Sequence, residues 1–148
     1  MFNVVLVEPE IPPNTGNIGR LCLATDATLH LVRPLGFSTD DRTLKRAGLD
    51  YWAEVKLRYW DSLGELQAAH DPGARYFFLT TKSTRSYAAV RFEPGDFLVF
   101  GRETKGLPEP LLEANPSRTL TIPMQGTRSL NLATAVAIVL FEAVRQQN

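Results

Sequence analysis

Three short segments of this chain combine glycine with asparagine, serine or arginine, and each adjoins an apolar stretch. They are residues 14–20 (NTGNIGR), 100–107 (FGRETKGL) and 122–131 (IPMQGTRSLN). Glycine lets a ligand approach the backbone closely, amide side chains donate and accept hydrogen bonds, and the arginine guanidinium binds phosphates and oxyanions. Loops of this composition on an apolar scaffold are typical of functional sites. We therefore predict one composite site for a small cofactor and an anionic partner.

The other reactive side chains form no recognised catalytic or metal-binding pattern. Cys22, the only cysteine, lies between two leucines, and we interpret it as a small buried hydrophobe. An internal disulfide and a cysteine-based zinc site are excluded, and His30 and His70 have no ligand-like neighbours in sequence. The first segment also lacks the GxGxxG pattern and the P-loop lysine. We expect no metal and no phosphate-binding glycine loop.

The pattern of apolar and polar residues predicts the elements that position these segments. Short β-branched or apolar runs indicate strands, and longer stretches that begin at capping residues indicate helices. The expected strands cover residues 3–7, 29–32, 55–60, 76–80, 96–100 and 119–122, and the expected helices cover about residues 15–25, 39–47, 61–69, 109–114 and 130–146.

Strands that alternate with helices at this spacing indicate an α/β fold, with a parallel sheet covered by helices on both faces. The chain shows neither a repeat nor a linker, so we expect a single domain over residues 1–148. In such sheets, ligands bind at the carboxyl ends of the strands. The first two segments follow predicted strands, and the third joins a strand to the last helix, so we expect all three at that edge.

The last predicted helix is apolar on nearly all sides. Between Leu130 and Phe141, only Asn131 and Thr134 are polar. A helix of this kind has to be covered all round, and a domain of this size covers one side with its own sheet. We therefore predict a symmetric homodimer that uses this helix. The alternative is a helix sandwiched within one monomer.

The overall composition is that of a soluble globular protein. Hydrophobic residues make up 44% and charged residues 22%, and 16 basic side chains balance 16 acidic ones. This balance argues against a protein that coats polyanions, although a local basic patch is compatible with it. The N-terminus meets Glu8 and Glu10 too early for a signal peptide, and the apolar stretch 132–141 is too short to span a bilayer. We expect a cytoplasmic protein without membrane association.

The motifs follow one another in a recognisable order. Asn14 and Arg20 come first, FGxExxGLP starts at Phe100, and IPM and SLN precede the apolar C-terminal helix. This order resembles the SPOUT methyltransferases, specifically the TrmH-like ribose 2′-O-methyltransferases, and the short TrmL type is the most similar. Residues 8–22 (EPEIPPNTGNIGRLC), 46–51 (RAGLDY) and 79–82 (LTTK) also look like that type. The resemblance covers nearly the whole chain.

The resemblance implies an α/β fold with a deep trefoil knot near the C-terminus and a homodimeric assembly. It also implies that S-adenosylmethionine binds in the knot. A neutral adenosine with a sulfonium carries no phosphates, in keeping with the missing phosphate loop. Carried onto this chain, the cofactor contacts would come from Leu79, Gly101, Ile122, Met124, Ser129 and Leu130.

The reaction implied by the resemblance is methylation of the ribose 2′-hydroxyl of the wobble nucleotide in tRNA, of the cytidine or uridine type. The tRNA would bind through its anticodon stem-loop. Arg20 would lie beside the 2′-hydroxyl, with Asn14, Glu103, Ser129 and Asn131 ordering the site. Because arginine does not readily lose its proton, we favour Arg20 as an electrostatic clamp over a general base. Candidates for RNA contact are Tyr51, Trp52, Lys82, Arg85, Arg91 and Arg118.

The chain departs from the family pattern at three places. Arg102 stands where close relatives often have proline, Lys105 stands where arginine is common, and the loop before Ser129 is one residue shorter. Two other functions are compatible with the sequence. One is 2′-O-methylation of another tRNA position or of ribosomal RNA, and the other is non-catalytic RNA binding by the same fold.

Overall fold

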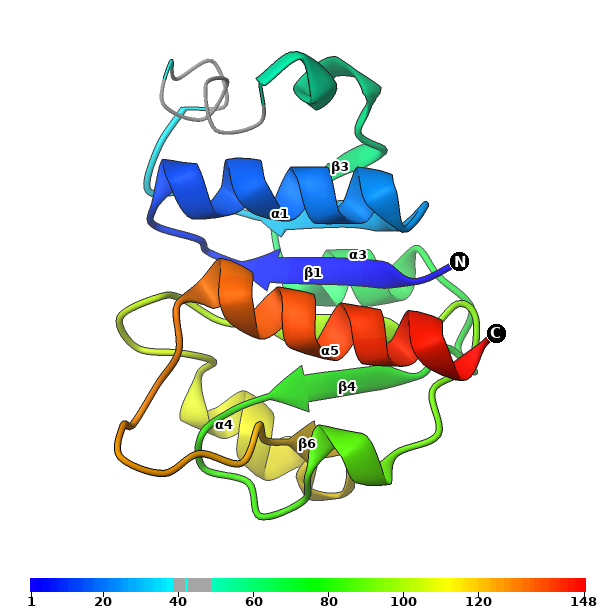
Figure 1. The fold of residues 1–148 in the computed structure, drawn as a ribbon, viewed down its shortest axis with the longest axis vertical. Helices are drawn as coiled ribbons and strands as arrows, with labels where there is room; N and C mark the ends of the chain where they lie inside the picture. The colour runs from blue at the N-terminus through cyan, green and yellow to red at the C-terminus, as the bar shows by residue number, and fades with distance from the viewer. Residues whose placement is uncertain (39–41, 43–48) are drawn as a thin grey trace.

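The computed structural model describes residues 1–38, 42 and 49–148. At its centre is a six-stranded sheet in the order β3-β2-β1-β5-β4-β6, and each pair of neighbouring strands is parallel (Figure 1). The strands are β1 (Asn3–Val7), β2 (Thr28–Val32), β3 (Leu57–Trp60), β4 (Tyr76–Leu79), β5 (Phe97–Phe100) and β6 (Thr119–Leu120). The predicted parallel α/β sheet is confirmed.

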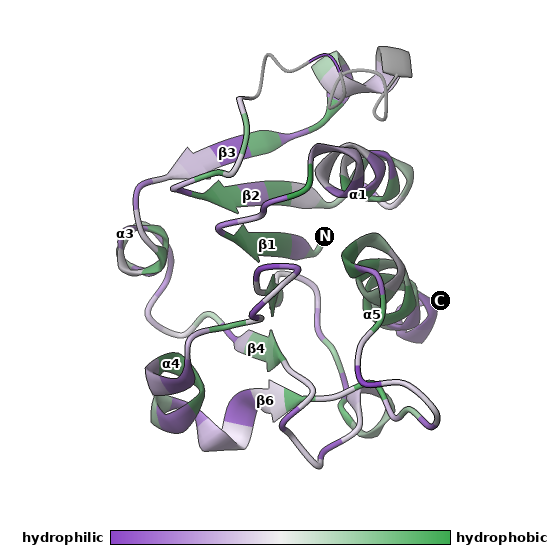
Figure 2. Ribbon diagram, turned by 90° about the vertical axis from the view of Figure 1, so that its left-hand side faces the viewer, coloured by the Kyte–Doolittle hydropathy of each residue, from purple (hydrophilic) through white to green (hydrophobic). Residues whose placement is uncertain are grey.

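Helices cover both faces of the sheet, as expected. Figure 2 shows α1 and α5 on one side and α3 and α4 on the other. In the described connections lie three short 3-10 helices, η1, η2 and η3. The bounds are α1 (Pro12–Ala24), η1 (Leu49–Glu54), α3 (Leu63–Ala68), η2 (Tyr87–Ala89), α4 (Glu109–Ala114), η3 (Pro116–Arg118) and α5 (Leu132–Gln146). The helix expected over residues 39–47 lies outside the described residues, apart from Arg42.

The core is divided by the sheet into two clusters of buried side chains. Because side chains alternate along a strand, Val4 and Leu6 of β1 pack toward α1 and α5, whereas Val5 and Val7 pack toward α3 and α4. All four are almost completely buried. A strand that is buried on both faces has a continuous run of apolar residues, and such a run is easily recognised in the sequence.

The boundaries of several elements differ from those expected. α1 begins at Pro12 instead of near Thr15, with Pro12 and Pro13 in its first turn. Proline suits these positions, because the first amides of a helix have no intrahelical acceptor. α5 begins at Leu132, and the Asn131 side chain caps it by accepting from the amides of Ala133 (2.9 Å) and Thr134 (3.2 Å).

α5 packs one side against the sheet and α1. Val136, Val139, Leu140 and Ala143 on that side are completely buried. On the outer side Phe141 is 44% exposed. The monomer therefore covers only part of this apolar helix.

Candidate active site

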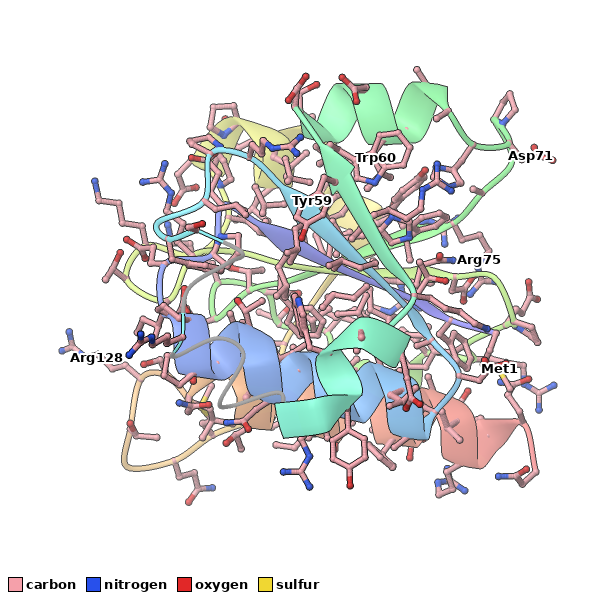
Figure 3. All side chains as sticks on the ribbon, turned by 90° about the horizontal axis from the view of Figure 1, so that it is seen from above. Met1, Tyr59, Trp60, Asp71, Arg75 and Arg128 are labelled. Atoms are coloured by element: carbon pink, nitrogen blue, oxygen red, sulfur yellow. The ribbon has the colours of Figure 1, made fainter. Side chains whose placement is uncertain are left out.

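A cleft of about 330 Å³ opens where β4, β5 and β6 end. Its walls come from three loops, which follow β4, β5 and β6. All six residues expected to contact the cofactor line it: Leu79, Gly101, Ile122, Met124, Ser129 and Leu130. Figure 3 shows Arg128, another lining residue, at the opposite end of the molecule from Met1, Asp71 and Arg75. The cleft therefore lies at the carboxyl edge of the sheet, where ligands bind in parallel α/β proteins.

The loop after β5 forms the middle wall of the cleft and folds back sharply on itself. The Arg102 amide donates to the Gly106 carbonyl (3.3 Å), and the Gly106 amide donates to the Arg102 carbonyl (2.9 Å). A Cβ at Gly101 would lie 2.1 Å from the Gly106 carbonyl carbon, and Gly106 itself has a φ of +67°. Both glycines are therefore required by the backbone of this loop.

A hydrogen-bonded chain of side chains joins the three sequence segments beside the cleft. Asn131 Nδ2 donates to Asn14 Oδ1 (3.0 Å), and Asn14 Nδ2 donates to Glu103 Oε2 (3.3 Å). Asn14 is buried, with 7% of its surface exposed. A buried amide has to satisfy both its donor and its acceptor, and here each of the other two segments supplies one partner. The convergence predicted for the three segments is confirmed.

Glu103 is held mainly by backbone donors from the segment before α1. Its Oε1 accepts from the Glu10 amide (2.8 Å), and its Oε2 accepts from the Ile11 amide (2.9 Å). Since both carboxylate oxygens are engaged, Glu103 orients the loop after β5 against the start of α1. Among the described residues, Glu103 forms no ion pair with Arg20.

Two further carboxylates fasten the same pair of loops, and sequence reasoning missed them. The Glu10 carboxylate accepts from the Thr104 hydroxyl (2.7 Å) and amide (3.1 Å), and these hydrogen bonds lower the pKa of Glu10. Glu8 pairs with Arg102, whose pKa is raised by this hydrogen bond. The only signal in the sequence is the pair of acids flanking Pro9, and nothing local shows what they bind.

Arg20 lies outside the cleft of its own chain. It follows Asn14 by six residues in α1, which places it about 9 Å further along the axis and about 240° around it. Its side chain is exposed, and its guanidinium lies over the Tyr51 ring, 5.2 Å from the ring centroid. Within the described part of the chain, Arg20 is not among the residues that line the cleft.

Several cationic side chains stand around the mouth of the cleft. Lys82, Arg102, Lys105 and Arg128 all belong to its lining. Two of the four are paired with carboxylates, Lys82 with Glu109 and Arg102 with Glu8. Thr80 and Thr81 add hydroxyl groups to the wall next to Leu79. The opening of the cleft is therefore positive and its inner wall is largely apolar.

The remaining reactive groups are structural. Burial raises the pKa of the Cys22 thiol to about 12, so this cysteine stays protonated. His30 Nδ1 accepts from the Trp60 indole (3.0 Å), so its Nε2–H faces Asn3 Oδ1 (2.9 Å). In the described residues, no three His, Cys, Asp or Glu side chains gather as metal ligands, and no helix is long and apolar enough to cross a membrane.

The fold and the cleft together define a class of protein. It is a parallel α/β protein with a cleft at the carboxyl edge of its sheet, beside three segments that the buried Asn14 joins. A family model described as the SpoU rRNA Methylase family matches residues 1–141. The chain belongs to this family, and the resemblance drawn from its motifs is confirmed.

Two relatives match this chain over nearly their whole length, and a third matches it over little more than half of its own length. A tRNA (cytidine(34)-2′-O)-methyltransferase from Burkholderia pseudomallei is 52% identical, over 99% of this chain and 96% of the relative. A solved structure concerned with 2-OH methylation of C/U34 on tRNA is 48% identical, with a TM-score of 0.93 over 99% of this chain and 96% of the other. An AdoMet-bound rRNA methyltransferase from Sinorhizobium meliloti is 25% identical, with a TM-score of 0.87 over 99% of this chain and 57% of the other.

Proposed function

We propose that this chain transfers a methyl group from S-adenosylmethionine to the ribose 2′-hydroxyl of nucleotide 34, the wobble position, in tRNA. The observation that carries this function is the 52% identity to a tRNA (cytidine(34)-2′-O)-methyltransferase over 99% of the chain. The cleft at the carboxyl edge of the sheet is the place where we expect the cofactor to bind. The substrate nucleotide is cytidine or uridine, presented in the anticodon stem-loop.

The chemistry of the cleft fits S-adenosylmethionine. Leu79, Ile122 and Leu130 offer apolar side chains to a planar base, and Gly101 and Ser129 belong to the same wall. Met124 completes the expected set. When bound, the cofactor supplies a methyl group on a positively charged sulfur. The chain's task is to hold that group and the ribose oxygen in near-attack geometry, with water excluded.

We assign the ordering of the site to the hydrogen-bonded residues beside the cleft. Asn14, Glu103 and Asn131 fix the relative positions of the three sequence segments, and their hydrogen bonds of 3.0 and 3.3 Å support this role. Ser129 lies on the cleft wall two residues before Asn131, the cap of α5. Arg20 acts as an electrostatic clamp on the 2′-oxygen or the adjacent phosphate, because its guanidinium stays protonated and stabilises negative charge.

We infer a homodimer that forms through α5. Its support is the outer side of this helix, where Phe141 is 44% exposed in an otherwise apolar sequence. Arg20 is exposed on α1, and α1 packs against α5, so we infer that a dimer formed through α5 brings Arg20 to the partner subunit. In this arrangement, a cleft and the Arg20 that serves it belong to different subunits.

We also infer the trefoil knot that the family resemblance implies. The chain leaves β6 at the edge of the sheet, where the Thr121 amide donates to the Arg85 carbonyl (2.8 Å) and its carbonyl accepts from the Tyr87 amide (2.9 Å). It then returns to the middle of the molecule as α5 (Figure 1). Thr121, the first residue after β6, thus pairs with the segment after β4 before the chain reaches the terminal helix, which supports threading at this point.

We assign the RNA surface to side chains around the cleft mouth, and two further candidates lie on η1. Lys82 lines the cleft, and Tyr51 and Trp52 belong to η1 beside Arg20. Arg85 and Arg91 are exposed, whereas the Arg118 guanidinium lies 5.3 Å from the Phe77 ring centroid. We propose that the protein acts as one domain in the cytoplasm, where its tRNA substrate is found.

The direct cellular test is mass spectrometry of nucleosides from total tRNA and ribosomal RNA. In cells that lack this protein, the account predicts loss of a 2′-O-methylated nucleoside from position 34 of specific tRNAs, with ribosomal RNA unchanged. Loss from ribosomal RNA or from another tRNA position would favour one alternative. Unchanged nucleosides and no thermal shift with S-adenosylmethionine would favour the other, a non-catalytic RNA-binding protein.

A further inference from the structure

Tyr51 is the side chain that Arg20 contacts in this structure. The Arg20 guanidinium lies 5.2 Å from the centroid of the Tyr51 ring, within the range of a cation–π interaction. Both side chains are exposed, and Tyr51 keeps 42% of its surface accessible. A guanidinium stacked on a ring is restricted in orientation, and its N–H edge stays free to meet an oxygen.

The position of Tyr51 is fixed through its neighbour in η1. A Cβ on Gly19 would lie 2.8 Å from the Trp52 ring, so the indole rests directly on the backbone of α1. Val55, just after η1, is buried in the main core cluster, and Trp52 packs against that cluster. The two consecutive pairs, Gly19 with Trp52 and Arg20 with Tyr51, therefore attach η1 to α1 at the point where Arg20 leaves the helix.

We propose that Tyr51 is a positioning residue for Arg20 in methyl transfer. The inference rests on the function and the Arg20 role proposed above. The ring holds the plane of the guanidinium, so that its donors face the oxygen on which negative charge develops. Since the long, exposed Arg20 side chain has several rotatable bonds to order, a fixed platform lowers the entropic cost of reaching the reactive geometry.

A different role for Tyr51 is direct stacking on a base of the RNA. The two roles predict different kinetic changes. A platform for Arg20 affects the chemical step, so its loss lowers kcat and leaves the affinities for tRNA and cofactor unchanged. A stacking contact with RNA affects binding, so its loss raises KM for tRNA. If Tyr51 is a platform, the effect of removing its ring depends on whether residue 20 is arginine. If Tyr51 stacks on a base, the effect is the same with either residue at position 20.

The test is steady-state methyl transfer to tRNA by the full chain, at saturating S-adenosylmethionine. Tyr51→Leu removes the ring, Tyr51→Phe keeps it, and Tyr59→Leu is the matched control, because Tyr59 lies under a different guanidinium, that of Arg33 (5.0 Å). We expect Tyr51→Leu to lower kcat about two- to fivefold, the range of an exposed cation–π contact. KM for tRNA should stay unchanged, and Tyr51→Phe and Tyr59→Leu should retain the wild-type kcat.

A double variant separates this inference from the proposed function. Lysine has no plane to orient, so in an Arg20→Lys background the further change Tyr51→Leu should lower kcat by less than twofold. Equal effects in both backgrounds, or a higher KM for tRNA with unchanged kcat, would overturn the positioning role while leaving the proposed function intact. Wild-type activity of Arg20→Lys alone would instead refute the role of Arg20. Thermal unfolding of each variant shows that the fold is retained.

Discussion

Replacing Gly101 by alanine tests whether the loop after β5 forms the cofactor wall. The added Cβ would lie 2.1 Å from the Gly106 carbonyl carbon, 2.3 Å from the Leu107 amide nitrogen and 2.5 Å from the Gly106 oxygen. All three are backbone atoms, so no side-chain rotation relieves the overlap. The turn has to open, and its two hydrogen bonds between Arg102 and Gly106 have to lengthen.

The size of the effect follows from the overlap. Ordinary contacts of a Cβ begin at 3.4 Å, so the wall of the cleft has to move by about 1.3 Å. A misplacement of about 1 Å at a reacting site costs about 100-fold in rate. Forcing an extra carbon into a packed site costs about 1–3 kcal/mol of stability. We expect Gly101→Ala to fold, to lose at least about tenfold in affinity for S-adenosylmethionine and to lose nearly all turnover.

The assay is calorimetric titration with S-adenosylmethionine, together with methyl transfer to tRNA. Gly64→Ala is the matched control, because a Cβ there meets nothing closer than Ser62 Oγ at 3.8 Å and Gly64 lies in a helix, where alanine is preferred. The control should bind the cofactor like the wild type. Wild-type affinity in a folded Gly101→Ala variant would refute the assignment of this loop to the cofactor site.

Three further predictions follow from the site and the core. Arg20→Lys keeps the charge but loses the planar fork, so it should lose most activity while binding S-adenosylmethionine normally by thermal shift; near-normal turnover would contradict the clamp role. Asn14→Ala should lower the free energy of unfolding in urea by about 1–3 kcal/mol, because the buried Asn14 amide is removed and Glu103 and Asn131 each lose a hydrogen bond, whereas Asn17→Ala at an exposed position of the same helix should change it by less than about 0.5 kcal/mol; equal effects would show that the network contributes nothing. Burial lowers the pKa of His30 to about 4 in the folded protein, whereas the ordinary pKa in the unfolded chain is 6.5. As the pH falls below 6.5, His30 therefore becomes protonated in the unfolded chain before it does so in the folded protein, and this favours unfolding. Between pH 7.5 and pH 5 this histidine should therefore remove about 2 kcal/mol of stability in urea unfolding, and His30→Gln, neutral at both pH values, should show a drop smaller by that amount.

The sheet and the convergence of the motifs could be predicted from the sequence, because both depend on local patterns. The run at residues 3–7 reads as a buried strand, and β1 has those bounds. The three segments that contain Asn14, Gly101 and Asn131 come after predicted parallel strands. Because parallel strands end at the same edge of a sheet, the fold brings these segments together. The cofactor-wall residues came instead from the family resemblance, and the structure places all six in one cleft.

Other features depend on long-range contacts that no local pattern reveals. Glu8 and Glu10 bind Arg102 and Thr104 more than ninety positions away, and nothing near the acids indicates these partners. The separation of Arg20 from the cleft was missed for a different reason. A motif gives only the order of the residues, whereas the helix face on which a side chain lies depends on the spacing between residues. Because Arg20 follows Asn14 by six residues, the two side chains leave α1 in different directions.

The most direct measurement of the central claim is the position of the methyl group that the purified protein adds to tRNA. Unmodified tRNA and S-adenosylmethionine with a labelled methyl group are incubated with the wild type and with Gly101→Ala, and the product is mapped by nuclease digestion and mass spectrometry. The account predicts one labelled methyl on the ribose 2′-oxygen of nucleotide 34 with the wild type and almost none with Gly101→Ala. A label on a base, at another nucleotide, or at equal levels with both proteins would contradict it.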